Sequence, residues 1–163
     1  TKHEVRYDMN KFSWGPIVEV TVLFLGIFVT MTPALAYLND HASSLGLNGV
    51  GQFYYMTGAL SSFLDNTPTA VAFHSVAAGL SPEQMAMFGV SMVAGVPEIL
   101  LKAICMGSVF FGAMTYIGNG PNFMVKAIAE ENGVKMPSFF GYMLKFSLIV
   151  LLPVYILVQL IFL

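Results

Sequence analysis

Long apolar stretches with few charges dominate the pattern along the chain. Residues 15–38 contain Glu19 as their only charged residue, residues 99–117 contain only Lys102, and residues 146–163 contain none. A helix rises about 1.5 Å per residue, so about 20 residues cross a hydrocarbon core of roughly 30 Å. No polar face recurs at the 3.6-residue spacing that a helix of a soluble bundle needs. The pattern therefore predicts an all-α integral membrane protein built as a helical bundle.

Turn-forming residues interrupt two of the apolar segments. Asp65-Asn66-Thr67-Pro68 falls inside one and Gly118-Asn119-Gly120-Pro121-Asn122 inside another. Proline breaks a helix interior, and asparagine and glycine favour turns, so we expect a break at each place. A polar N-terminal segment (1–14) precedes a membrane domain (15–163), in which we expect a span at 15–38, a hairpin at 50–80, a broken helix at 97–131 and a span at 138–163. A short amphipathic piece at 82–95 is expected between the hairpin and the broken helix.

The segment at 50–80 allows two topologies, a single crossing or a re-entrant hairpin. If it is re-entrant, every Lys and Arg except Lys102 falls on or near one side of the membrane. If it crosses, the last three lysines move to the side opposite the N-terminal basic residues. Cytoplasmic loops carry an excess of Lys and Arg. We therefore expect a re-entrant hairpin, with the start of the chain in the cytoplasm and its end outside.

The two breaks together predict a binding site. Irregular backbone at membrane depth is tolerated only where protein or a water-filled cavity satisfies its polar groups, and many secondary transporters build their sites from such discontinuous helices. The candidate ligands are Ser61, Ser62, Asp65, Asn66, Thr67 and Thr69 at the hairpin, and Thr115, Asn119 and Asn122 at the second break, where Gly118 and Gly120 permit close backbone approach. Such oxygen ligands suit a hard cation such as Na⁺, a proton, or both in turn.

Asp65 is the candidate ligand whose side chain carries a charge inside an expected membrane segment. A charge at the centre of a membrane costs about 2.5–3.5 kcal/mol on insertion scales, so we expect this carboxylate to bind a cation rather than only to cap a helix. Asp65 and Asn66 are the candidate Na⁺ ligands. The alternative for Asn66 and Asn119 is a cap or turn, which asparagine also favours.

Other ionisable residues have simpler interpretations. His74, in the returning arm of the hairpin, is a candidate proton relay, and the alternative is a packed or hydrogen-bonded histidine. Glu19 lies about one turn inside the first span, where its side chain can reach the interface. Glu98 and Lys102 are four residues apart, which predicts a local ion pair.

Composition excludes several other classes of protein. Only 10% of the residues are charged, against roughly 25% in soluble domains, and the net charge of −2 gives no nucleic-acid signal. The single Cys105 excludes a disulfide within the chain. An intramembrane aspartyl protease needs two aspartates that share a proton, and Asp65 is the only aspartate in an expected span. We therefore expect a membrane transporter rather than an enzyme, with no catalytic residues, no cofactor and no nucleic-acid partner. A membrane subunit without transport activity is a remote alternative, since it would not need two polar breaks.

The two interruptions resemble motifs of a known group. Residues 61–69, SSFLDNTPT, resemble the hairpin-tip motif of the ion transporter superfamily, and residues 115–126, TYIGNGPNFMVK, resemble its broken-helix motif. Within that group the chain is similar to the citrate-transport family, whose members are often called sodium:proton antiporters. The likeness runs from Trp14 into the last span.

This resemblance implies a protein of two inverted repeats, each with one hairpin and one broken helix. The present chain resembles the C-terminal repeat, so the N-terminal repeat of the same protein is an expected partner, together with the lipid bilayer and a second copy in a homodimer. The location that we expect is the inner (cytoplasmic) membrane of a bacterium.

Two transport functions fit these observations. The first is Na⁺/H⁺ antiport, in which the Asp65 carboxylate alternately binds Na⁺ and H⁺. The alternative is cation-coupled transport of citrate or a dicarboxylate. A carboxylate at the hairpin tip repels citrate unless cations neutralise it, and no Arg lies in an expected span to bind a carboxylate with two hydrogen bonds. Both arguments favour the antiporter, although Lys126 remains available as a point charge.

Overall fold

The computed structural model describes residues 2–5, 7 and 14–163. The described chain divides into two units, residues 1–34 and 35–163. Helix α1 (Gly15–Asp40) crosses the boundary between the units and contains Pro33. Most of the expected N-terminal segment at 1–14 and the side chain of Glu19 lie outside the described residues. The description below concerns the unit at 35–163.

This unit is mostly helical, as the apolar pattern predicts. The short 3-10 helix η2 (Ala42–Leu45) leads into α2 (Val50–Ser61), α3 (Asn66–Ala78) and α4 (Pro82–Ala86). The strands β1 (Met92–Val93) and β2 (Val96–Pro97) precede α5 (Glu98–Phe111) and α6 (Gly120–Glu131). The chain ends in one continuous helical run of α7 (Phe139–Tyr142), the π-helical stretch η3 (Met143–Leu151) and α8 (Leu152–Phe162).

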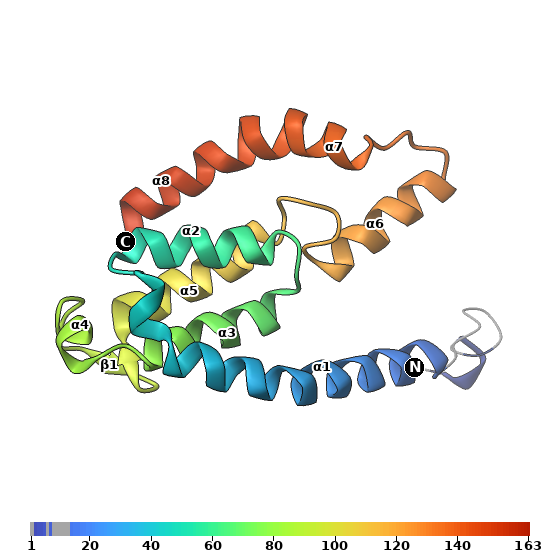
Figure 1. Cartoon of the computed structure of the whole chain (residues 1–163). Coiled ribbons are helices and arrows are strands. Elements are labelled where there is room, and N and C mark those ends of the chain that lie inside the picture. The colour runs from blue at the N-terminus through green and yellow to red at the C-terminus, as the bar shows by residue number, and fades with distance from the viewer. Residues whose placement is uncertain (1, 6, 8–13) are drawn as a thin grey trace. The chain divides into compact units, whose positions relative to one another are not determined.

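Helices α2 and α3 form a hairpin whose outer ends lie together beside η2 (Figure 1). The amide of Asn39, just before η2, donates to the Ser75 carbonyl near the end of α3 at 3.0 Å. Residues 62–65 turn the chain between the two helices. The sequence predicts a break at residues 65–68, but Asn66 to Pro68 form the first turn of α3. A proline is tolerated there because the first-turn N–H groups have no partner within the helix.

The second break also lies earlier than the sequence predicts. Helix α5 ends at Phe111, residues 112–119 form the break, and α6 begins at Gly120. Pro121 therefore occupies the first turn of α6, a position that its fixed φ favours. The expected amphipathic piece at 82–95 is wrong beyond Ala86, because β1 and β2 pair antiparallel there through Ala94 (φ 51°) and Gly95 (φ 81°). Two successive residues with positive φ are typical of a tight hairpin turn.

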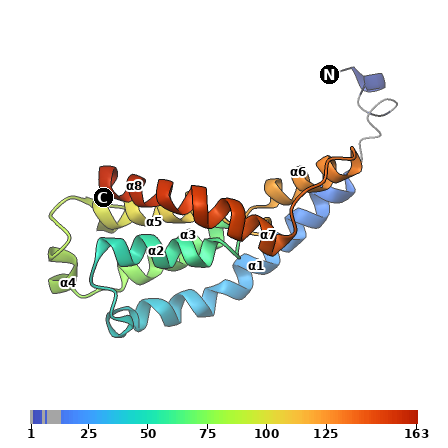
Figure 2. The same ribbon diagram turned by 90° about the horizontal axis from the view of Figure 1, so that it is seen from above.

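The core lies where α5 packs against α2 and α3 (Figure 2). Two glycines let α2 and α5 approach closely. A Cβ on Gly107 would lie 2.5 Å from the Tyr54 carbonyl oxygen, and a Cβ on Gly58 would lie 2.5 Å from the Phe111 ring. Small residues at helix contacts are typical of membrane bundles, in which van der Waals packing drives association.

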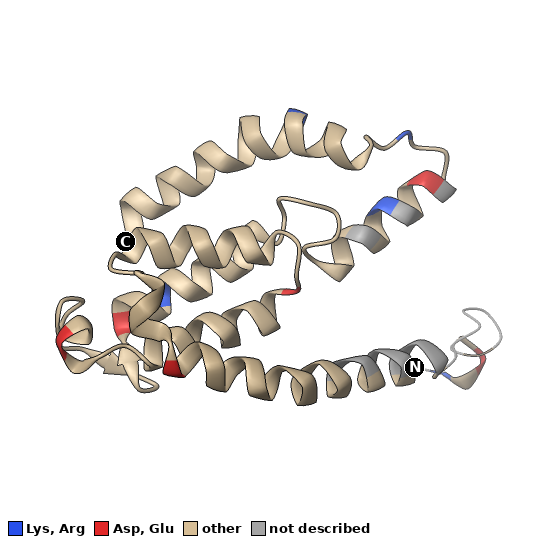
Figure 3. Ribbon diagram, viewed as in Figure 1, with Lys and Arg blue, Asp and Glu red and all other residues tan. Residues whose placement is uncertain are grey.

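Charge and apolar length are distributed as in a membrane protein. Helices α2, α3 and α8 contain no Lys, Arg, Asp or Glu (Figure 3). Among the described residues, one helical run, Phe139–Phe162, has the length of 24 residues and the mean hydropathy of 2.3 that suit a crossing of a membrane. The expected re-entrant course of α2 and α3 stays a prediction, because no membrane boundary is fixed by the fold.

Cysteine labelling of the full-length protein tests that topology. Asn48→Cys and Glu83→Cys flank the hairpin, and Lys135→Cys follows α6. In a Cys105→Ala background, a membrane-impermeant thiol reagent should label the first two from the outer side and the third from the cytoplasmic side, because α2 and α3 return to the side they enter from. Labelling of positions 48 and 83 from opposite sides would show that residues 50–80 cross the membrane.

Candidate functional site: two helix breaks in contact

The hairpin tip is held by local hydrogen bonds around Asp65. This residue is the N-cap of α3, and its Oδ1 accepts the Asn66 backbone N–H at 2.7 Å. The Thr69 hydroxyl donates to the Asp65 carbonyl at 3.0 Å. The Asp65 side chain is exposed, whereas Thr69 is buried. The hydrogen bonds made by the Asp65 side chain and by the Thr69 hydroxyl therefore fix the backbone of the tip. The carboxylate is left at the edge of the tip.

Thr115 organises the second break. Its hydroxyl oxygen accepts the backbone N–H groups of Ile117 at 3.2 Å and Gly118 at 3.0 Å. The same hydroxyl donates to the Ser62 carbonyl in the hairpin turn. Thr115 is 1% exposed, so these bonds lie away from solvent. One side chain thus shapes the break and joins it to the hairpin tip.

Several further contacts bring the two breaks together. Ser61 Oγ lies 2.6 Å from the Ser108 carbonyl oxygen of α5 and 2.9 Å from Asn66 Oδ1. Ser62 Oγ lies 3.4 Å from the Phe111 carbonyl oxygen. A Cβ on Gly118 would lie 2.8 Å from the Ser61 carbonyl oxygen and 2.7 Å from that of Ser62. The backbone of the second break therefore rests directly on the hairpin turn.

The starts of two helices converge at Gly112, the first residue of the second break. Asn66, in the first turn of α3, contacts Gly112 through its side-chain oxygen. Asn122, in the first turn of α6, donates its side-chain amide to the Gly112 carbonyl at 3.4 Å. Helix N-termini carry unpaired N–H groups and a partial positive charge, which favour an anion. Carbonyl and hydroxyl oxygens beside them favour a hard cation.

The sequence of the chain matches a known protein family. A family model described as "Putative citrate transport" matches residues 1–163. The chain belongs to this family. The match confirms the resemblance drawn from residues 61–69 and 115–126. Comparison with curated proteins and with solved structures gave no match.

In this member of the citrate-transport family, the candidate site residues differ in how closely the structure brings them together. Those brought into direct contact are Ser61, Ser62, Asn66, Thr115, Gly118 and, through Gly112, Asn122. Asp65 and Thr67 lie exposed at the tip, and Asn119 is the half-buried N-cap of α6. Gly120 makes no close approach, since a Cβ there would meet nothing within 4 Å. Gly120 opens α6 without a close backbone contact in this structure, so its expected role in binding stays a prediction.

The remaining ionisable candidates lie apart from the breaks. His74 is nine residues along α3 from Asp65, about 13 Å at the helical rise, and its Nε2 lies 3.1 Å from the Ala94 carbonyl oxygen. This is the hydrogen-bonded histidine of the alternative interpretation. The predicted pair of Glu98 and Lys102 is confirmed at 2.9 Å. Lys126 pairs with Glu130 at 2.7 Å, so its charge is already engaged.

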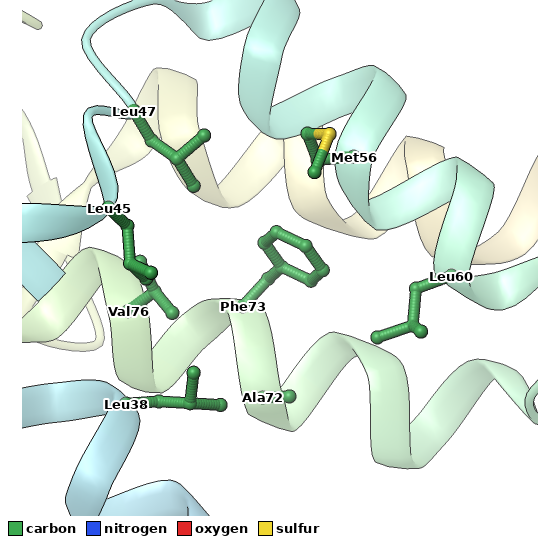
Figure 4. Close-up of a pocket in the computed structure, with 8 residues that line it drawn as sticks. All are labelled: Leu38, Leu45, Leu47, Met56, Leu60, Ala72, Phe73 and Val76. Carbon is green, nitrogen blue, oxygen red and sulfur yellow. The ribbon is translucent and has the colours of Figure 1, made fainter. Parts of the chain in front are cut away.

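A separate apolar pocket does not have the chemistry of this site. It has a volume of about 230 Å³ and lies among η2, α2, α3 and the end of α1 (Figure 4). Its lining consists of Leu38, Leu45, Leu47, Met56, Leu60, Ala72, Phe73 and Val76. A ligand site needs a few polar groups to orient its ligand. No polar side chain lines this pocket, so it offers nothing to orient a carboxylate.

Sequence reasoning missed the residues that complete the site from other helices. Ser108 and Gly112 contribute backbone carbonyls rather than side chains, and only the three-dimensional contact reveals that role. Three hydroxyl residues of the last helical run, Tyr142, Ser147 and Tyr155, also reach the end of α5. Their hydroxyl groups within a mostly apolar segment are the available sequence signal.

Gly118 and Gly120 provide a matched test of this contact. Gly118→Ala places a methyl group against backbone oxygens of Ser61, Ser62 and Gly112, so we expect a loss of about 1–3 kcal/mol in the free energy of unfolding. Gly120→Ala meets open space and should change it little. Thermal unfolding of the full-length protein in detergent measures both. Equal unfolding midpoints for the two variants would contradict the close contact of the breaks.

Proposed function

We propose that the chain forms half of a cation-coupled transporter for a di- or tricarboxylate of the citrate class. The observation that carries this proposal is the convergence of the α3 and α6 N-termini on Gly112, beside the oxygen-rich contact between the two breaks. Family membership supports a carboxylate as the substrate. The substrate would lie against the helix N-termini, and the coupling cation would lie among the neighbouring oxygens.

The exposed carboxylate of Asp65 supplies a reason for coupling. Like charges at close range repel, and a cation or a proton at Asp65 removes that repulsion. The substrate then binds more tightly when the cation is present, and the cation binds more tightly when the substrate is present, because coupling between two sites is reciprocal. The groups that we propose for the cation are Asp65, Asn66 and the hydroxyls of Ser61, Ser62, Thr67, Thr69 and Thr115. The backbone and amide contacts that we propose for the substrate are Gly118, Asn119, Gly120 and Asn122.

Na⁺/H⁺ antiport is the second candidate, and the position of Asp65 favours it. The carboxylate is exposed at the tip and uses Oδ1 for its cap, so the other oxygen is available to an ion. Competition between Na⁺ and H⁺ for this carboxylate would suffice for exchange. His74 would relay protons only at a second location along α3.

The wider assembly is part of the same proposal. The N-terminal inverted repeat of the same protein would supply the other half of the pathway, and two copies would form a homodimer in the lipid bilayer. The distribution of Lys and Arg supports a topology with the start of the chain in the cytoplasm and the end of α8 outside, and the membrane that we propose is a bacterial inner membrane. The protein would act as a transporter and not as an enzyme.

Asp65→Asn tests the proposed function. Asparagine caps a helix about as well as aspartate, so folding should be retained, while the charge and the titration are lost. We expect cation-driven uptake of labelled citrate into proteoliposomes to fall at least about tenfold, the effect of losing roughly 1.4 kcal/mol of binding. His74→Ala should retain most of the activity, because its ring lies away from the breaks.

The matched control is Asp40→Asn, the same substitution at the end of α1. It should leave uptake unchanged. Parental citrate uptake with unchanged cation dependence in Asp65→Asn would overturn the proposed role of the carboxylate. Na⁺-driven pH change without citrate uptake in the parent protein would replace the carboxylate transporter with the antiporter.

A further inference from the structure

The last helical run reaches the end of α5 through three hydroxyl groups. The Tyr155 hydroxyl donates to the Phe110 carbonyl at 2.6 Å, and the Tyr142 hydroxyl donates to the Ala113 carbonyl at 3.1 Å. The Ser147 hydroxyl donates to the Met114 carbonyl at 2.6 Å. All three acceptors belong to the last turn of α5 or to the break that follows it.

Two of these bonds satisfy the carbonyls of Ala113 and Met114, which lie in the break, whereas the Phe110 carbonyl also accepts the Ala113 N–H at 3.2 Å. The last four carbonyls of any helix lack partners within the helix, and an unpaired carbonyl is costly in apolar surroundings. The two carbonyls between the acceptors are also satisfied. That of Phe111 accepts the Met114 N–H at 2.9 Å, and that of Gly112 accepts the Asn122 amide at 3.4 Å. Residues 110–114 thus form five consecutive carbonyls, each with a donor.

The π-helical winding of η3 explains how one helix presents both Tyr142 and Ser147. In an α-helix, residues five apart point about 140° away from each other, because each turn takes 3.6 residues. A π-helix closes its hydrogen bonds between residues five apart, so such residues stack on one face. The stretch at Met143–Leu151 is wound in this way, and Ser147 at its centre is fully buried. Two neighbouring carbonyls of the break are therefore reached from one helix face.

We propose that Tyr142, Ser147 and Tyr155 are positioning residues for the transport site. They do not touch the proposed ions or substrate. They fix the backbone at residues 110–114, which precedes Thr115. The position of Thr115 is thereby fixed, together with its hydrogen bonds to the Ser62 carbonyl and to the N–H groups of residues 117 and 118. The importance of this role for transport rests on the proposed function, whereas the positioning itself does not.

Hydrogen exchange of the full-length protein in detergent tests the positioning without any transported substrate. Tyr142→Phe and Ser147→Ala each leave the carbonyl of Ala113 or Met114 without its side-chain donor, and Tyr155→Phe removes one of the donors to the Phe110 carbonyl. We expect amide exchange in residues 112–119 to accelerate about two- to tenfold, the range for losing one hydrogen bond. Exchange in α2 should stay at the parental rate. Tyr55→Phe is the matched control, because the Tyr55 hydroxyl has no hydrogen bond within the described chain, and its exchange should equal that of the parent.

Transport kinetics provide the second readout. The same variants should raise the half-saturating concentration of the coupling cation about two- to tenfold, with a smaller change in maximal rate. Parental exchange at 112–119 in all three variants would overturn the inference. Acceleration spread uniformly over the whole chain would also overturn it, because that result indicates a general loss of stability. Local acceleration with no citrate transport in the parent would leave the positioning role intact and would reject the proposed substrate instead.

Discussion

The hydrogen bond from the Thr115 hydroxyl to the Ser62 carbonyl is the contact on which the arrangement of this site depends. It joins two interruptions that are more than fifty residues apart in the chain. Each interruption alone would leave backbone groups unpaired in apolar surroundings, and such groups cost several kcal/mol in hydrocarbon. Because the two breaks lie against each other, some of these backbone groups are hydrogen-bonded across the contact. The glycine at position 118 is required because the backbones meet with no room for a side chain.

Hydroxyl side chains lie beside other backbone carbonyls at the breaks. This role explains where hydroxyl residues occur in so apolar a sequence. Ser61 and Ser62 approach carbonyls of α5 from the hairpin, while Tyr142, Ser147 and Tyr155 approach from the last helical run. The end of α5 and the break that follows it therefore lie at the centre of the site. Hydroxyl groups of the hairpin and of the last helical run surround their carbonyls. Ser61, Ser62, Thr115 and Ser147 are buried, so they act first on the backbone. Asp65 remains as the exposed charged group at the tip.

Much of this arrangement could be predicted from the sequence, and the failures have physical causes. The apolar pattern and the polar interruptions predict the helices and the two breaks. The sequence predicts both breaks too late along the chain, because Pro68 and Pro121 lie in the first turn of the following helix rather than in the break itself. The β-hairpin at Met92–Pro97 depends on positive φ at Ala94, which alanine does not signal. The π-helical winding of η3 and the acceptors at residues 110–114 depend on contacts between distant segments, which no local pattern contains.

Under the proposed function, the same geometry would let one small site bind ions of opposite charge. The starts of α3 and α6 present partial positive charge around Gly112, and the Asp65 carboxylate presents negative charge within one residue of the α3 start. An anion drawn to the helix starts meets repulsion from Asp65, and a cation drawn to Asp65 meets repulsion from the helix starts. When both ions are present, each offsets the repulsion felt by the other. In the transporter that we propose, coupled binding would follow from the placement of one carboxylate beside two helix N-termini and would need no distant conformational signal.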